Sequence, residues 1–220
     1  MTSKEILSRC LEDWVLRHLP GPAQTCAAPI ATYSMPEEEA ALIGRAVSRR
    51  KDEFSTGRHL ARAALSRLGC PVTALGMGKF RQPLWPEGTT GSISHDGGYC
   101  IAAAQHIKSG VAGIGLDLID IPGRTSRMAE IAPLFLADEK ELAAVNVISS
   151  LIMPELLVFS LKEAILKAMA GQLDRFIDLR EIQLHGQTAT KVRLAGELVP
   201  MRLSAEQIGP ILVTLAIRLR

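Results

Sequence analysis

The stretch GIGLD at residues 113–117 lies inside an apolar run that spans 111–121. Neighbouring side chains of a strand point to opposite faces, so Gly113 and Gly115 share a face with Asp117, and Ile114 and Leu116 lie on the other. The apolar face is expected to pack on a core. The glycine face leaves room for a ligand to approach the backbone and ends in a carboxylate. Taken alone, Asp117 only ends a strand and opens a turn.

A second motif, FSLKEAILK at 159–167, follows about forty residues later. Glu163 and Lys167 are four residues apart and share one helix face. Helix physics alone favours a structural interpretation, in which Ser160 caps the helix and Glu163 reaches back to complete a capping box. The alternative is an acid–lysine pair that, together with Asp117, holds a divalent metal and a polyphosphate. Mg²⁺ keeps several waters, so one or two carboxylates plus phosphates suffice.

Composition limits the classes of function. The chain has 220 residues, 47% of them hydrophobic, and a net charge of +2. This is enough for one large or two small cores, and no global charge points to nucleic acid or a membrane. The four cysteines are scattered without a CxxC pair, which is typical of reduced cysteines. Residues 1–20 lack an apolar core and polar residues interrupt 142–161, so a cytoplasmic protein with no secretory signal and no membrane span is expected.

The order of predicted elements indicates an α+β fold in two similar lobes, residues 1–110 and 111–220. We predict helices over 1–20, 36–68, 126–145 and 151–170, and strands over 26–34, 92–94, 99–104, 111–121, 180–194 and 211–219. Ser34 caps the second helix, Gly57 is expected to divide it, and residues 95–98 are expected to form a turn.

Several polar residues of the first half could contact phosphate. A run of arginines from Arg45 to Arg67 is either a solvated helix face or a phosphate clamp, because guanidinium forks match phosphate. His95 follows Ser94 on the predicted turn and could donate to a phosphate oxygen, although a lone histidine there is more often a surface residue. Residues 81–83 begin a proline-punctuated loop that could form a floor for a flat ligand. Aromatic residues are only 4%, which disfavours a surface that stacks nucleic-acid bases.

Taken in order, these motifs resemble the 4′-phosphopantetheinyl transferases of the Sfp/EntD type. That family carries a GxD strand and then the pattern W/F-S/T-x-K-E-A/S-x-x-K, preceded by a basic helix, a proline-containing loop and Ser-x-Ser-His. The matching segments here are 115–117, 159–167, 54–61, 81–86 and 91–95. The Gly-Arg-x-x-Ala and R-x-P-x-W-P variants resemble the EntD branch. Each motif alone is weak evidence for the family, whereas five motifs in the same order are specific to it.

The resemblance implies a pseudo-dimeric, two-lobed α+β fold and a monomer. It implies transfer of 4′-phosphopantetheine from coenzyme A to a serine hydroxyl of an apo acyl or peptidyl carrier protein, which leaves adenosine 3′,5′-bisphosphate. Siderophore, polyketide and fatty-acid carriers all remain open as partners. Coenzyme A is expected between the lobes with Mg²⁺, or alternatively Mn²⁺, on its pyrophosphate.

The resemblance also assigns roles to individual residues. Asp117 and Glu163 bind the metal, and Glu163 acts as, or positions, the base for the carrier serine. Lys162 and Lys167 neutralise phosphate charge as the leaving group departs. The expected coenzyme A contacts are Ser94 and His95 on phosphates, Arg49 and Arg58 on phosphates, and Arg81, Gln82 and Pro83 along the adenine.

One position departs from the pattern. Many Sfp-type members carry a second acid two residues after the aspartate, where this chain has Ile119. Asp120 would point to the opposite face of a regular strand, so two protein carboxylates and an extra water are expected on the metal unless a bulge turns Asp120 inward. Ile119 keeps a second hypothesis open, a catalytically silent coenzyme A-binding protein. A third is a nucleic-acid or phosphoprotein binder that uses the arginine run.

Overall fold

The structure is a computed structural model that describes residues 2–107, 110–186 and 191–220. The chain divides into two compact units, residues 1–111 and 112–220. In both, helices pack on antiparallel strands, which confirms the predicted α+β class.

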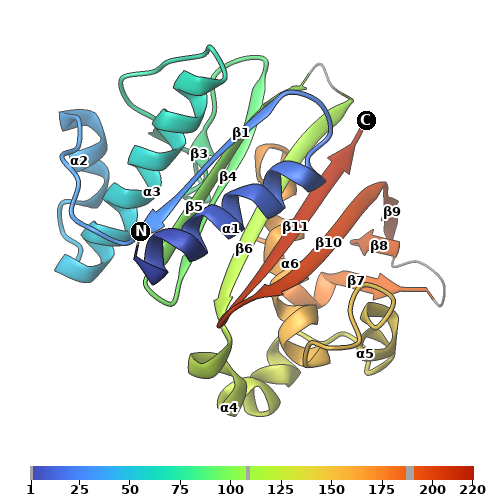
Figure 1. The fold of residues 1–220 in the computed structure, drawn as a ribbon. Helices are drawn as coiled ribbons and strands as arrows, with labels where there is room; N and C mark the ends of the chain where they lie inside the picture. The colour runs from blue at the N-terminus through green and yellow to red at the C-terminus, as the bar shows by residue number, and fades with distance from the viewer. Residues whose placement is uncertain (1, 108–109, 187–190) are drawn as a thin grey trace. The chain divides into compact units, whose positions relative to one another are not determined.

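Unit 1 holds a sheet of order β1-β5-β4, with antiparallel pairing throughout, and a short β2-β3 ladder (Figure 1). Its elements are α1 (Ser3–His18), β1 (Ala23–Pro29), α2 (Glu37–Ile43), α3 (Ser48–Arg67), β2 (Gly76–Met77), β3 (Pro83–Leu84), β4 (Thr89–Asp96) and β5 (Tyr99–His106).

Helix α3 covers one face of this sheet, where Leu60, Ala64 and Leu65 pack with Cys100 and Ala102. The helix runs through Gly57 without interruption, so the predicted break there is wrong. A Cβ atom on Gly57 would lie 2.7 Å from Ile93 Cγ2. The glycine therefore allows α3 to approach β4 closely, and the actual break falls between α2 and α3.

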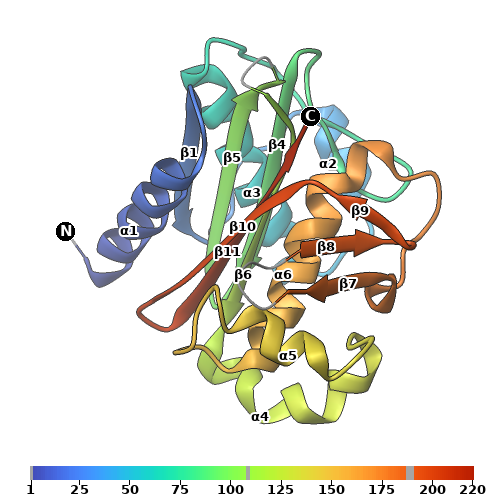
Figure 2. The same cartoon turned by 90° about the vertical axis from the view of Figure 1, so that its right-hand side faces the viewer.

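Unit 2 holds a sheet of order β10-β11-β6 and a smaller antiparallel sheet of order β7-β8-β9 (Figure 2). Its elements are β6 (Val111–Asp120), α4 (Ile121–Ile131), α5 (Lys140–Val145), α6 (Pro154–Met169), β7 (Ile182–His185), β8 (Lys191–Leu194), β9 (Glu197–Val199), β10 (Met201–Ile208) and β11 (Ile211–Leu219).

Helix α6 lies against the β10-β11-β6 sheet, and its residues Leu157, Leu161 and Ile165 share an apolar cluster with Leu212 and Ala216 of β11. Two predictions for unit 2 differ from the structure. The single helix predicted over 126–145 is two helices, α4 and α5, and β10 was not predicted at all. No residue of β10 is fully buried, because the strand lies at the sheet edge, although Met201, Leu203 and Ala205 alternate along it and pack against the apolar cluster of unit 2. No helix in the described ranges is long and apolar enough to cross a membrane.

Candidate active site

The glycine face of β6 packs against α6. A Cβ atom on Gly113 would lie 2.1 Å from the carbonyl oxygen of Ala168, and one on Gly115 would lie 1.8 Å from that of Ala164. Any side chain at either position would collide with the helix backbone. The expectation that these glycines admit a ligand is therefore wrong, because the space is occupied by α6.

Asp117 lies two residues further along the same face and is only 7% exposed. Its two carboxylate oxygens receive hydrogen bonds from different turns of α6. Lys167 Nζ donates to Oδ1 over 2.7 Å and to the Leu116 carbonyl over 2.8 Å. Ser160 Oγ donates to Oδ2 over 2.9 Å. The strand carboxylate and the helix lysine that the sequence singles out are thus direct partners.

Ser160 is not a helix cap. Helix α6 begins at Pro154, a residue favoured at the first helical position, so Ser160 lies inside the helix and the predicted capping box is wrong. Its hydroxyl is buried and lies 2.8 Å from Thr214 Oγ1 of β11. No pattern in the sequence connects Thr214 with Asp117, since the contact depends on how α6 crosses the sheet.

Glu163 sits in a partly desolvated environment. Burial raises the pKa of its carboxyl group, the Lys167 ammonium opposes this, and the negative charge of Asp117 adds to it. Two acids that disfavour each other's ionisation are a suitable pair for a cation. Within the described residues, no group of three or more His, Cys, Asp or Glu side chains could hold a metal. Asp117 and Glu163 are the two predicted donors, and a pair of carboxylates fits a hard cation that completes its shell with phosphate and water.

Ile119, at the position of the second family acid, is 2% exposed and belongs to the apolar cluster of unit 2. Strand β6 continues to Asp120, which stands at the N-terminal boundary of α4. The alternation of a regular strand places Asp120 on the face opposite Asp117.

Lys162 is 0% exposed. Its ammonium donates to Glu141 Oε2 and to the Phe135 carbonyl, each over 2.7 Å. Glu141 also accepts from the backbone amides of Ala137 and Leu184. Burial lowers the pKa of Lys162 and the Glu141 carboxylate opposes that shift. This internal ion pair joins α5, α6 and β7, and it argues against the expectation that Lys162 contacts phosphate.

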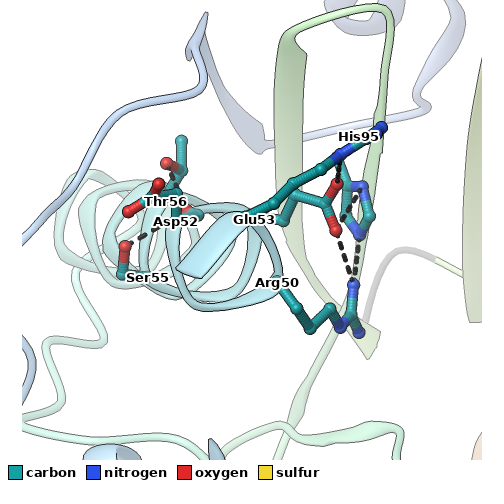
Figure 3. Close-up of polar contacts among 7 residues, drawn as sticks. Arg50, Asp52, Glu53, Ser55, Thr56 and His95 are labelled. Atoms are coloured by element: carbon teal, nitrogen blue, oxygen red, sulfur yellow. Dashed lines mark hydrogen bonds and ion pairs between the residues drawn. The ribbon is translucent and has the colours of Figure 1, made fainter. Parts of the chain in front are cut away.

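In unit 1, a cationic cluster surrounds Glu53 of α3 (Figure 3). Arg50 Nη1 donates to His95 Nε2 over 2.7 Å and to Glu53 Oε2 over 3.3 Å, and His95 Nδ1 lies 3.7 Å from that oxygen. Arginine only donates, so His95 Nε2 accepts and Nδ1 carries the proton. His95 lies within β4, opposite Cys100, rather than on the predicted turn, which falls at Gly97 and Gly98 with positive φ.

Arg49 and Arg58, the two arginines expected to contact phosphate, have different surroundings from Arg50. Arg49 pairs with Glu53 over 3.1 Å, but its side chain is 84% exposed. Arg58 is 3% exposed and donates to the carbonyls of Leu75 and Gly76. Burial lowers the pKa of Arg58. The Arg58 guanidinium therefore fixes the start of β2, which argues against direct contact with a ligand. The sequence analysis did not single out Arg50, which adjoins Arg49 and contacts His95.

The remaining predicted contacts lie on β3, β4 and the loop before β3. Arg81 is exposed and has a left-handed φ of 66°, a conformation that costs a non-glycine residue about 1–2 kcal/mol. Gln82 Oε1 accepts from the amide of Phe80, and Pro83 pairs with Met77. Ser94 is buried in β4. Their roles toward adenine and phosphate stay predictions.

Comparison with known proteins supplies the family. The 4′-phosphopantetheinyl transferase N-terminal domain matches residues 38–105, and the 4′-phosphopantetheinyl transferase superfamily matches residues 113–211. Enterobactin synthase component D of Escherichia coli K12 is 32% identical over 149 residues, which cover 67% of this chain and 68% of that protein. The chain belongs to the 4′-phosphopantetheinyl transferase family.

Other family members are also similar to the chain. The 4′-phosphopantetheinyl transferase Npt of Nocardia iowensis is 34% identical over 143 residues, which cover 65% of this chain and 62% of that protein. The chain thus spans less than two thirds of this relative. The solved acyl carrier protein synthase AcpS of Mycobacterium tuberculosis is 26% identical, with a TM-score of 0.35, over 49% of this chain and 96% of that one.

Both groups of candidate residues fall inside segments that match the phosphopantetheinyl transferase family. Asp117, Glu163 and Lys167 lie in the superfamily match, and Arg50 and His95 lie in the N-terminal domain match.

Proposed function

We propose that this protein transfers 4′-phosphopantetheine from coenzyme A to a serine hydroxyl of an apo carrier protein. The observation that carries the proposal is the pairing of Asp117 with Lys167, beside Glu163, in a segment that matches the family. Relatives named 4′-phosphopantetheinyl transferase support the reaction type.

In this reaction the serine oxygen forms a bond to the phosphorus that bears pantetheine. The bond from that phosphorus to the bridging pyrophosphate oxygen breaks, and adenosine 3′,5′-bisphosphate leaves. The serine proton passes to Glu163, or to a water that Glu163 holds, and a carboxyl group whose pKa is raised is a better acceptor near neutral pH. Lys167 offsets negative charge as it develops on the leaving group.

Asp117 and Glu163 would hold the divalent ion, Mg²⁺ or Mn²⁺. When bound, the ion supplies neutralisation of the pyrophosphate charge, the main requirement of phosphoryl transfer. Lys167 Nζ already donates to Asp117 Oδ1, so an ion bound at this oxygen would share it with the ammonium group.

For coenzyme A phosphates, Arg50 is a stronger candidate than Arg49 or Arg58, and contact of His95 with phosphate stays a prediction. Arg50 is fixed by two partners while its side chain stays 41% exposed, so guanidinium donors remain for an anion. Arg81 and Gln82 remain candidates for the adenine. Because of the similarity to enterobactin synthase component D, a siderophore-type peptidyl carrier is the first substrate to test.

The proposal is tested by loading an apo carrier with Asp117→Ala, Glu163→Ala and Glu163→Gln in the presence of coenzyme A and Mg²⁺. All three are expected to lose at least about 100-fold in rate, since each removes a metal ligand or base. Asp138→Asn changes an exposed acid of the same unit and serves as the control. Full activity in both alanine variants would refute the metal assignment.

Ile119 favours one alternative, a coenzyme A-binding protein without catalysis, because it leaves the metal with one carboxylate fewer than many relatives. Calorimetry with coenzyme A, with and without Mg²⁺, separates the two when run beside the loading assay. Tight Mg²⁺-dependent binding without loading of any carrier would support the alternative.

A further inference from the structure

We infer that Ser160 and Thr214 form a buried hydroxyl pair that holds Asp117 as a one-oxygen ligand for the divalent ion. The inference rests on the proposed function, because it takes Asp117 as a metal ligand. Both hydroxyl residues are positioning residues, since they act through the carboxylate.

The direction of each hydrogen bond follows from counting protons. Each hydroxyl has one hydrogen. Ser160 Oγ lies 2.9 Å from Asp117 Oδ2, and an ionised carboxylate can accept but not donate, so the Ser160 proton points to it. Thr214 must then donate across the 2.8 Å contact to Ser160 Oγ. The Ser160 carbonyl, 3.2 Å from Thr214 Oγ1, is a second and longer acceptor for the same hydrogen.

Burial makes this arrangement hard to exchange. Ser160 and Thr214 are 0% exposed, so water is not a replacement partner. A serine inside a helix ordinarily bonds the carbonyl four residues back, whereas Ser160 reaches across to the strand. The close approach of α6 to β6 at Gly115 and Ala164 allows this reach.

The consequence concerns the two oxygens of Asp117. Oδ2 is committed to Ser160, and Oδ1 is the oxygen that Lys167 contacts. A divalent ion that binds Oδ1 would share this oxygen with the Lys167 ammonium, and it would meet a carboxylate whose plane Ser160 has already fixed. Partners that orient a metal ligand in this way typically contribute 10- to 100-fold in metal affinity.

The test is a titration of the full chain with Mn²⁺, in which the relaxation of water protons reports how much Mn²⁺ is bound. Ser160→Ala is expected to weaken Mn²⁺ binding about tenfold, within the usual range for partners of a metal ligand. Thr214→Val, which keeps shape but loses the hydroxyl, should weaken it about threefold, the effect of one neutral hydrogen bond. Thr214→Ser restores the hydroxyl and should restore affinity. The double variant should be no weaker than Ser160→Ala, because Thr214 acts only through Ser160.

The Asp117→Asn variant separates the metal assignment of Asp117 from the positioning role of Ser160. If it weakens Mn²⁺ binding while folded Ser160→Ala binds as the wild type does, the inference is wrong and the metal assignment stands. If Asp117→Asn binds Mn²⁺ normally, the metal assignment and the inference both fail. Urea unfolding identifies variants that do not fold. If Ser160→Ala does not fold, the Thr214 variants decide the test, and equal Mn²⁺ affinities of Thr214→Val and Thr214→Ser would overturn the inference.

Discussion

The environment of Glu163 penalises its own charge. Burial raises the pKa of the carboxyl group above its value in the unfolded chain, so the folded state binds the proton more tightly. Stability is then greatest below the unfolded pKa and falls as pH rises through the folded pKa. In the metal-free protein the ionised Glu163 side chain lowers stability, and a bound cation would offset this cost.

Glu163→Gln is therefore expected to raise the free energy of unfolding of the metal-free protein at pH 7.5, with the difference from wild type disappearing toward pH 4. Urea unfolding in EDTA at both pH values measures this. Glu155→Gln, in the first turn of the same helix, is the control and should gain nothing, because an acid there favours the helix dipole. A Glu163→Gln protein less stable than wild type at pH 7.5 would show that the Lys167 attraction outweighs burial.

Two adjacent arginines of α3 offer a matched comparison. Arg50 is fixed by His95 and Glu53, whereas Arg49 is 84% exposed. Arg50→Ala is expected to raise the KM for coenzyme A by about 10- to 100-fold, the worth of a charge-assisted hydrogen bond, and Arg49→Ala by about twofold or less, as for exposed ion pairs. Steady-state kinetics on the same carrier measures both. Equal effects would remove the cluster around Glu53 from the coenzyme A site.

At the scale of elements, the contact of β6 with α6 decides the geometry around Asp117. Gly115→Ala would put a methyl group against the backbone of α6. Forcing the helix away should cost about 3 kcal/mol and also weaken Mn²⁺ binding. Gly171→Ala is the matched control, because an added Cβ there meets nothing within 4 Å. Urea unfolding of both variants measures the difference, and equal stability would mean that α6 moves without cost.

The ion pair of Lys162 with Glu141 is the second contact that places α6. Lys162→Met should destabilise the protein by about 3–5 kcal/mol, because it leaves the Glu141 charge buried without its partner. Lys140→Met, at a side chain 91% exposed, should change stability by less than about 0.5 kcal/mol. Chemical denaturation compares them. A stable Lys162→Met protein that loses only catalytic rate would instead return Lys162 to the phosphate site.

These elements also show how far the sequence predicts the site. Strand β6 and helix α6 were predictable, because a long apolar run and a helical repeat are local signals. The family motif assigns Asp117 and Lys167 to one site but to different ligands, so their direct pairing was not predicted. The role of the glycines, the position of Ser160 and the buried Lys162 could not be predicted, since each depends on which helix face meets which strand face. The start of α6 at Pro154 agrees with the helix predicted over 151–170, so the capping box at Ser160 was inconsistent with that helix prediction.

At the scale of the whole molecule, the chain comprises two α+β units, and each holds part of the proposed machinery. Unit 2 carries the candidate metal and base residues, and unit 1 carries the candidate phosphate contacts. Repetition of the helix-then-strand order was visible in the sequence because it needs only element types.

The most direct measurement is the intact mass of an apo peptidyl carrier protein after incubation with this protein, coenzyme A and Mg²⁺, with a parallel sample in EDTA. The account predicts a mass gain of one phosphopantetheine group on the carrier that EDTA prevents and that Asp117→Ala does not produce. A gain that persists in EDTA would contradict the metal role of Asp117 and Glu163. No gain on siderophore, polyketide and fatty-acid carriers alike would contradict the proposed transfer itself.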